Sequence, residues 1–200
     1  PRLSLAIRGV GGQGNLFFGK VLAQVAFLAG YDDRNILKGE THGMAQMGGP
    51  VISTFGCGEV FSPALVPGTA NVLIAMEKAE VLRPGFLDLL EPGGTVLMAD
   101  TRILPHGLKP EAYPSDEAIA AQLEGYRVVS VDVLSIALNL GDPKGRCANV
   151  AMLGVLSTLP PFDVVPEAVW LQALRGISRK PALWDLNHAA FMAGRGMQKG

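Results

Sequence analysis

Apolar residues recur along this chain in short runs that are separated by glycine-rich or proline-rich turns. Leu3, Leu5 and Ile7 alternate with smaller or polar residues, which is the period of a strand, and the run stops at a cluster of glycines. Residues 15–29 follow the cluster as a mostly apolar stretch that predicts a helix ending at Gly30. The first unit is therefore predicted to be a strand, a glycine turn and a helix.

Further apolar runs predict a sheet that is mostly parallel. Residues 51–55 and 59–62 flank a glycine-bounded turn and predict a hairpin, which would make the sheet mixed. Residues 72–75 and 95–99 predict strands buried on both faces, and 126–131 predicts the last strand of parallel type. Turns or irregular segments are expected at 91–94 and 103–114, and helices at 117–123, 149–159, 167–175 and 186–195. The fold class is therefore α/β: one three-layer α/β/α, Rossmann-like domain over 1–200, with a mixed, mostly parallel sheet and a helical C-terminal third.

The glycine turn has the spacing G-x-G-x-x-G at Gly9, Gly11 and Gly14. Glycines permit a positive φ and close approach of the backbone, and the free N–H groups at the helix start suit an anionic group. Gly14, Gly19 and Lys20 nearly match the phosphate-loop motif of nucleotide-binding proteins. The next residue, Val21, lacks the hydroxyl that would bind a magnesium ion, which argues against this motif. The alternative interpretation is structural: the glycines would be required only because the strand packs tightly against the helix.

A nicotinamide dinucleotide site would also need an acidic residue about 20 positions further on, at the end of the second strand. Asp32 and Asp33 have that spacing but precede the weak second strand at 36–37, so they would lie at its wrong end. This placement argues against a freestanding nicotinamide-dependent enzyme.

The segment 38–50 is predicted to be a loop between two strands. It carries Glu40, Thr41, His42 and Gln46 within seven positions, and loops at strand ends of α/β sheets often carry sites. His42 could act as an acid, a base or a hydrogen-bond donor. The alternative is a surface loop with an incidental histidine.

Other polar or aromatic residues have structural interpretations beside functional ones. Glu77 follows the strand 72–75 and is a second candidate site residue, or a solvated charge at a helix start. Asn149 and Asn187 are each expected to open a helix, where capping would explain them. Trp170 and Trp184 are expected to anchor a core or an interface.

Composition narrows the functional classes. The chain is 48% hydrophobic, so some apolar surface is expected to be covered by partners. The net charge of −1 provides no basic stripe for nucleic acid, and no apolar run approaches the roughly 20 residues of a spanning helix. No signal segment precedes the first strand, which favours the cytoplasm. Cys57 and Cys147 are isolated, so an iron–sulfur cluster held by this chain alone is excluded, and His106 and His188 are too distant to pair as metal ligands.

Six motifs in order resemble the gamma-type subunit of 2-oxoacid:ferredoxin oxidoreductases across nearly the whole chain. These motifs are Arg8–Gly14, Glu40–Gly49, Asn71–Glu77, Pro92–Gly94, Asn149–Gly154 and Asn187–Gly194. The loop Glu40–Gly49 is most similar to that of the small (beta) subunit of indolepyruvate oxidoreductases. Aromatic 2-oxoacid relatives such as phenylglyoxylate oxidoreductase are also similar. Met47 stands where that branch usually has Arg, and Asn71 where it usually has Asp.

The resemblance implies a CoA-dependent oxidative decarboxylation of a 2-oxoacid to an acyl-CoA, with electrons passing to ferredoxin. Thiamine diphosphate with Mg²⁺ would be bound by alpha- and beta-type partner subunits, and [4Fe-4S] clusters by a ferredoxin-like subunit or domain. The chain alone is expected to hold no cofactor and to show no activity. The candidate catalytic residues are His42 and Glu40, and the candidate cofactor-binding residues are Gly9, Gly11, Gly12, Gln13, Gly14, Gln46 and Asn149.

The turn 9–14 and the loop 40–49 are expected to lie side by side at the carboxyl edge of the sheet, facing a partner subunit. A scaffold subunit without a catalytic role is the remaining alternative.

Overall fold

The computed structural model describes residues 1–9, 15–42, 51–60, 62, 65–104 and 106–197, with the backbone alone for Asn15, Thr41, His42 and Val51. The described strands form one sheet in the order β2-β3-β1-β4-β5-β6. They are β1 (Leu3–Gly9), β2 (Ile36–His42), β3 (Val51–Cys57), β4 (Ala70–Ala75), β5 (Leu90–Ala99) and β6 (Arg127–Val131). β3 is antiparallel to β1 and β2, whereas β1, β4, β5 and β6 are parallel. The carboxyl ends of the strands other than β3 therefore meet at one edge of a mixed, mostly parallel sheet, as predicted.

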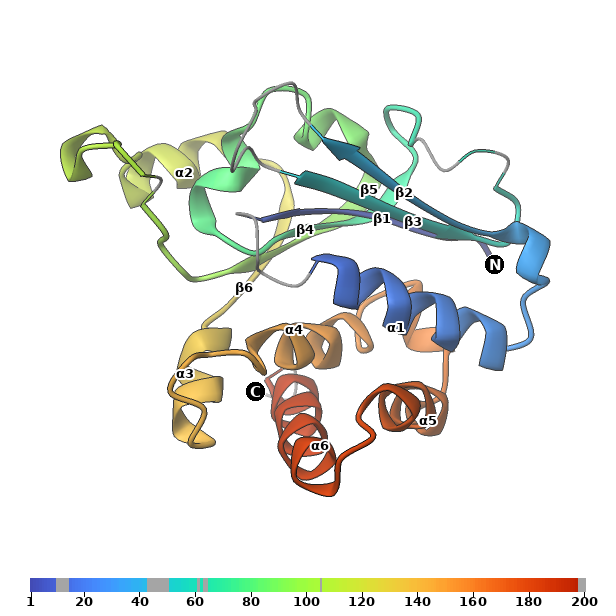
Figure 1. Ribbon diagram of the computed structural model, residues 1–200. Coiled ribbons are helices and arrows are strands. Elements are labelled where there is room, and N and C mark those ends of the chain that lie inside the picture. Colours follow the sequence, from blue (N-terminus) through green and yellow to red (C-terminus); the bar gives the residue numbers. More distant parts are fainter. Residues whose placement is uncertain (10–14, 43–50, 61, 63–64, 105, 198–200) are drawn as a thin grey trace.

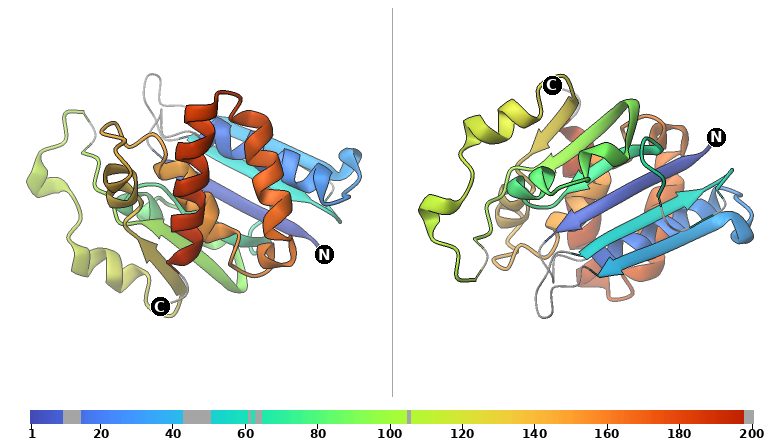
Figure 2. Two further views of the ribbon diagram at one scale, coloured as in Figure 1. Left: turned by 90° about the horizontal axis from the view of Figure 1, so that it is seen from below. Right: turned by 90° about the horizontal axis from the view of Figure 1, so that it is seen from above.

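Helices cover one face of the sheet much more heavily than the other. α1 (Asn15–Leu28) and α4 (Ala148–Leu156) lie against that face, and α5 (Glu167–Ile177) and α6 (Pro181–Gly196) lie outside them (Figures 1 and 2). α3 (Val133–Asn139) follows β6 on the same side. The opposite face carries α2 (Asp116–Gln122) and two 3₁₀ segments, η2 (Lys78–Leu82) and η3 (Leu87–Leu89). The predicted three layers are present, with an outer row of helices added on one side.

Alternation along the strands divides the buried apolar residues between two cores. Leu3, Leu5 and Ile7 of β1 pack with α1 and the C-terminal helices. Ala6 of β1 joins the smaller core under η2 and α2. All residues of β1 are buried, including the polar residues Ser4 and Arg8 on the face of Ala6. Each large side chain fully buried in this way contributes about 1.5–3 kcal/mol to folding.

Glycines bring α4 and α6 into close contact. A Cβ atom built on Gly154 would collide with the carbonyl oxygen of Phe191, and one on Gly194 would collide with the carbonyl oxygen of Ala151. The absence of a side chain at both positions therefore permits the close approach of the two helices. This crossing holds the two rows of helices together.

Asn71 fastens three strands at the amino end of the sheet. Its Oδ1 accepts a hydrogen bond from the backbone N–H of Ser4 (2.8 Å), and its Nδ2 donates to Glu91 (2.8 Å). An aspartate could accept from Ser4 but could not donate to Glu91. The asparagine at this motif position is therefore suited to its partners. A Cβ on Gly94 would lie 2.9 Å from the Asn71 carbonyl oxygen, so the motif glycine permits β5 to approach β4.

The predicted hairpin is wrong. Residues 59–60 and 62 are not in a strand, and β3 instead pairs with β2 and β1. Lys38 to His42, predicted as loop, belong to β2. β2 is an edge strand, where polar side chains such as those of Lys38 and Glu40 remain exposed, so the segment lacks the apolar pattern of an inner strand.

Several helix boundaries also differ from the predictions. Asn187 does not open a helix, because α6 begins at Pro181; its buried amide donates to the Ser178 hydroxyl (2.8 Å). The short helix α3 was not predicted, and Asp132 caps it by accepting from the Ser135 N–H (3.0 Å). Residues 91–94, predicted as a turn, lie within β5, where Gly93 has a φ of +78°. None of the described helices is long and apolar enough to cross a membrane.

Candidate functional site

The carboxyl edge of the sheet brings together two of the sequence motifs. Gly9 ends β1 and His42 ends β2, and both pair with Val51, the first residue of β3. The strand ends that lead into the glycine turn and the motif loop therefore flank the start of β3. The turn and the loop themselves lie outside the described residues, so their side-by-side placement stays a prediction. The remaining candidates Gly11, Gly12, Gln13, Gly14 and Gln46 lie outside the described residues, and so does the side chain of His42.

A buried ion pair adjoins the start of the glycine turn. Arg8 is only 7% exposed, and its Nε donates to Glu80 Oε2 of η2 at 3.1 Å. Arg83 donates to the other oxygen of the same carboxylate at 3.4 Å, and the Arg8 guanidinium lies 5.9 Å from the centre of the Phe86 ring. Separating the two partners would leave an uncompensated buried charge, which is unfavourable. The ion pair therefore stabilises the packing of η2 against β1.

Glu77 follows β4 and is 1% exposed, so the interpretation as a solvated charge is wrong. The Tyr113 hydroxyl donates to its carboxylate at very short range, and the Ile103 N–H donates at 3.5 Å. Burial is the main cause that raises the pKa of Glu77, and backbone hydrogen bonds oppose it in part. Glu77 thus ties the irregular crossover at 101–114 to the carboxyl end of β4.

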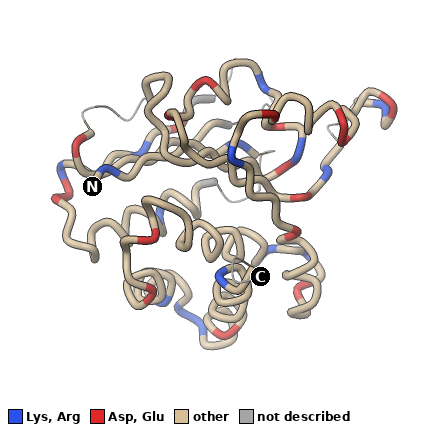
Figure 3. Tube along the Cα trace, turned by 180° about the vertical axis from the view of Figure 1, so that it is seen from behind, with Lys and Arg blue, Asp and Glu red and all other residues tan. Residues whose placement is uncertain are grey.

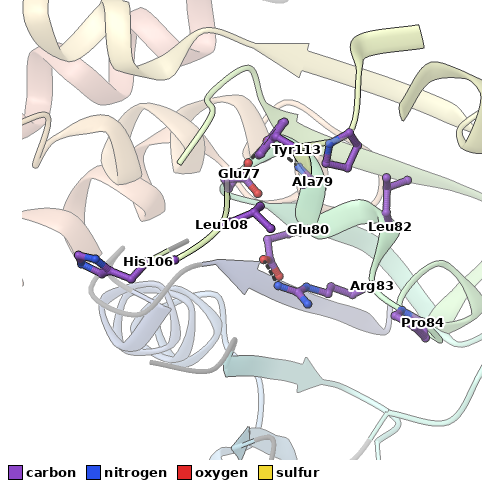
Figure 4. Close-up of a pocket in the computed structure, with 11 residues that line it drawn as sticks. Glu77, Ala79, Glu80, Leu82, Arg83, Pro84, His106, Leu108 and Tyr113 are labelled. Carbon is purple, nitrogen blue, oxygen red and sulfur yellow. Dashed lines mark hydrogen bonds and ion pairs between the residues drawn. The ribbon is translucent and has the colours of Figure 1, made fainter. Parts of the chain in front are cut away.

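A cavity of about 560 Å³ on the η2 face of the sheet is lined by Glu77, Glu80, Arg83 and Tyr113, among others. In Figure 4 the Glu77 carboxylate lies beside Tyr113, Glu80 and Arg83 pair below them, and His106 stands apart at the far end. The cavity therefore combines a carboxyl group of raised pKa, a phenol and an ion pair. Perturbed carboxyl groups in such cavities are frequent in functional sites.

Sequence reasoning identified Glu77 here but missed its partner Tyr113 and the ion pair of Arg8 with Glu80. A usable signal existed in β1, where Ser4, Ala6 and Arg8 alternate on one face of a strand that is buried on both faces. A charged side chain at such a position requires an opposite charge nearby. The acidic partner, Glu80, lies 72 positions away and could not be chosen from the sequence.

Asn149 occupies a different cavity, on the helical face. It lies one residue inside α4, with Cys147 as the N-terminal cap residue, and it lines a space of about 500 Å³ together with Phe17 of α1 and Arg146. The Cys147 N–H donates to Asp142 Oδ2 at 2.7 Å. Burial acts to raise the pKa of Asp142, but hydrogen bonds to its carboxylate outweigh this and hold that pKa below the ordinary value. Asn149 therefore shares a cavity with the first turn of α1 but not with Glu77.

Glu40 lies in a third cavity, of about 380 Å³, between α1 and the β2–β3 pair. The candidate residues are thus distributed over three cavities around the carboxyl half of the sheet. Charges of both signs are scattered over the chain rather than gathered on one face (Figure 3).

The thiols are poor ligands as they stand. Cys57 and Cys147 are both buried and free, and burial raises the pKa of each to about 11. Metal binding requires a thiolate, which this burial disfavours. The described residues include no group of three or more His, Cys, Asp or Glu side chains placed to hold a metal ion.

The fold and site define a Rossmann-like α/β domain that has Gly9, His42 and Glu77 at the carboxyl ends of its strands and Glu40 and Asn149 in separate cavities. The chain matches the pyruvate ferredoxin/flavodoxin oxidoreductase family over residues 4–197 and belongs to that family. It is 33% identical to the indolepyruvate oxidoreductase subunit IorB of Thermococcus kodakarensis over 197 residues, 96% of this chain and 93% of the relative. It is 35% identical to the subunit of the same name from Archaeoglobus fulgidus over 159 residues, 78% of this chain and 76% of the relative.

Solved structures with the same fold include gamma-type subunits. The gamma subunit of a keto/oxoacid ferredoxin oxidoreductase from Geobacter sulfurreducens superposes with a TM-score of 0.69 at 21% identity, covering 97% of this chain and 94% of the other. The pyruvate oxidoreductase subunit PORC from Thermotoga maritima has a TM-score of 0.70 at 20% identity, covering 96% and 94%. The resemblance drawn from the motifs is confirmed, and the chain is a subunit of a 2-oxoacid:ferredoxin oxidoreductase complex.

Proposed function

We propose that this chain lends the carboxyl edge of its sheet to a thiamine-diphosphate-dependent complex that converts an aromatic 2-oxoacid to an acyl-CoA. The substrate would be of the indolepyruvate or phenylglyoxylate type, with electrons passing to ferredoxin or a related acceptor. The observation that carries the proposal is the convergence at one edge of Gly9, the end of β2 at His42 and the buried carboxyl of Glu77. The named function of the indolepyruvate relatives supports the choice of substrate.

Iron–sulfur clusters are assigned to a partner. A [4Fe-4S] cluster uses four cysteine thiolates, and this chain has two cysteines, both buried as thiols of high pKa. Thiamine diphosphate and Mg²⁺ are assigned to the alpha- and beta-type subunits on the family resemblance. The contribution of this chain is then binding and orientation at the shared edge.

CoA fits the groups that this chain offers on the helical face. Arg146 and the Asn149 amide can donate hydrogen bonds to its phosphates or amides, and the N–H groups of the glycine turn suit an anion at the start of α1. When bound, CoA supplies the thiol that accepts the acyl group. The proposed roles of Glu40 and His42 are to orient that thiol or the 2-oxoacid and to accept or donate a proton.

The test is steady-state kinetics on reconstituted complexes in which CoA and the 2-oxoacid are varied separately. Gly11→Val should lower turnover, because a β-branched side chain blocks close approach and resists positive φ. His42→Ala should weaken catalysis by about ten- to a hundredfold, the value of one hydrogen bond to a charged group, about 1.5–3 kcal/mol.

The pattern of the constants distinguishes the roles. A rise in the KM for CoA alone supports binding of the CoA phosphates by the turn. A change in the KM for the 2-oxoacid alone indicates that the turn and the loop contact the 2-oxoacid instead. Wild-type kinetic constants for both variants in fully assembled complexes would refute a catalytic contribution. The chain would then be interpreted as a scaffold subunit.

A further inference from the structure

The cavity that contains Asn149 has apolar walls from four helices. These walls come from α1, α4, α5 and α6, in the form of Phe17, Val150, Ile177, Leu183 and Leu186. Leu183 remains 44% exposed although it lines the cavity, so apolar surface faces open space there. A flat apolar group in this space of about 500 Å³ would cover that surface, which is favourable.

One polar group points into the apolar space. Asn187 lines the cavity and is only 6% exposed, and its Nδ2 donates to the Ser178 hydroxyl at 2.8 Å. This bond orients the amide, so Oδ1 lies on the side away from Ser178, where it accepts no hydrogen bond from the described residues. The described side-chain atoms that are both sealed from solvent and unpaired are Ser53 Oγ and Trp170 Nε1. The Asn187 Oδ1 is therefore not sealed, and a ligand atom in the cavity can reach it.

The groups of the cavity define the chemistry of a suitable ligand. An amide oxygen only accepts hydrogen bonds, so the ligand must present an N–H or O–H donor within an otherwise apolar outline. Arg146 lines the same cavity, is exposed and forms no ion pair with a described residue, so it favours an anionic group next to that outline. A flat ring that carries an amino group and is joined to a phosphate combines these features, as an adenine nucleotide does.

We propose that this cavity binds the adenine base of CoA, an assignment that rests on the proposed function. The apolar walls enclose the ring, and the exocyclic amino group of adenine donates to Asn187 Oδ1. Arg146 and Asn149 retain the phosphate contacts proposed above, because the phosphates are attached to the same nucleoside. Phe17 lies in the first turn of α1, so a base in the cavity leaves its phosphates near the start of that helix. The arm that ends in the thiol then lies outside the cavity.

The experiment titrates the reconstituted complex, without 2-oxoacid, with adenosine 3′,5′-bisphosphate and with inosine 3′,5′-bisphosphate by isothermal calorimetry. Inosine has a carbonyl oxygen in place of the amino group, so it cannot donate to Asn187 from that position. The complex should bind the adenosine compound about tenfold more tightly, and Asn187→Leu should abolish this preference. Asn187→Asp retains an acceptor and should retain the preference. A purely structural asparagine would leave the preference unchanged in Asn187→Leu.

Leu183→Ala tests the apolar wall without changing a buried group. It should raise the dissociation constants of both probes about threefold or more, because less apolar surface is then covered by the base. Leu138→Ala is the matched control: Leu138 is a similarly exposed leucine of α3 outside the cavity, and this variant should bind like wild type.

Absence of saturable binding, equal binding of the two probes by wild type, an undiminished preference in Asn187→Leu, or wild-type binding by Leu183→Ala overturns the proposal. So does displacement of the bisphosphate by indolepyruvate whose own binding is weakened in Asn187→Leu, because the cavity would then hold the ring of the 2-oxoacid. None of these outcomes decides the kinetic test above, since Gly11→Val could still raise the KM for CoA through the glycine turn.

Discussion

Replacing Gly154 by alanine tests whether the contact between α4 and α6 holds the helical rows together. The added Cβ would collide with the Phe191 carbonyl oxygen and lie 3.0 Å from the Arg195 backbone nitrogen. Both atoms belong to the backbone of α6, so neither can rotate away as a side chain would. The helices must separate, and the buried ring of Phe191 loses part of its packing.

The size of the effect follows from two opposing terms. Alanine in place of glycine favours a helix by about 1 kcal/mol, whereas overpacking costs about 1–3 kcal/mol and more when backbone must move. The collision is between backbone atoms, so we expect the upper end and a net loss of about 2 kcal/mol. For a chain of this size that loss lowers Tm by about 4–8 °C.

Gly176 provides the matched control. It lies in α5, and a Cβ there meets nothing within 4 Å, so Gly176→Ala should gain up to about 1 kcal/mol. Urea unfolding followed by far-UV circular dichroism measures both variants against wild type. A Gly154→Ala midpoint equal to or above that of Gly176→Ala would refute the reasoning.

Three further predictions concern the polar groups on the η2 face. Glu80→Gln leaves the Arg8 guanidinium buried without its anion and should lower the free energy of unfolding by about 3–5 kcal/mol, whereas Arg83→Gln, at a half-exposed partner, should cost less than about 1 kcal/mol in the same urea titration. Tyr113→Phe removes the donor to the Glu77 carboxylate and should cost about 1–3 kcal/mol; an unchanged midpoint contradicts this. Because the pKa of Glu77 is raised above the unfolded value of about 4.3, its stabilising contribution is complete below that pH and is lost as pH rises through the folded pKa. Glu77→Gln should abolish this decline, so parallel wild-type and variant stabilities across that pH range would show the reasoning to be wrong.

The sequence by itself determined those elements whose burial is visible in their own local pattern of apolar residues. β1 and α1, the inner strands β4 and β5, and α4 with its glycine contact were all predictable, because a period of two or 3.6, or an unbroken apolar run, reports burial of that segment directly. The motifs also identified the family, since they preserve residue types at turns and strand ends where the backbone permits few alternatives.

The tertiary structure decided what depends on partners distant in the chain. β2 exists because β3 pairs with it at the edge of the sheet, although Lys38 and Glu40 give it no apolar stripe. Glu77 is buried because the crossover with Tyr113 folds over it, and Arg8 finds Glu80 across 72 positions. Such pairings form when strand order brings remote segments together, and local periodicity contains no record of that order.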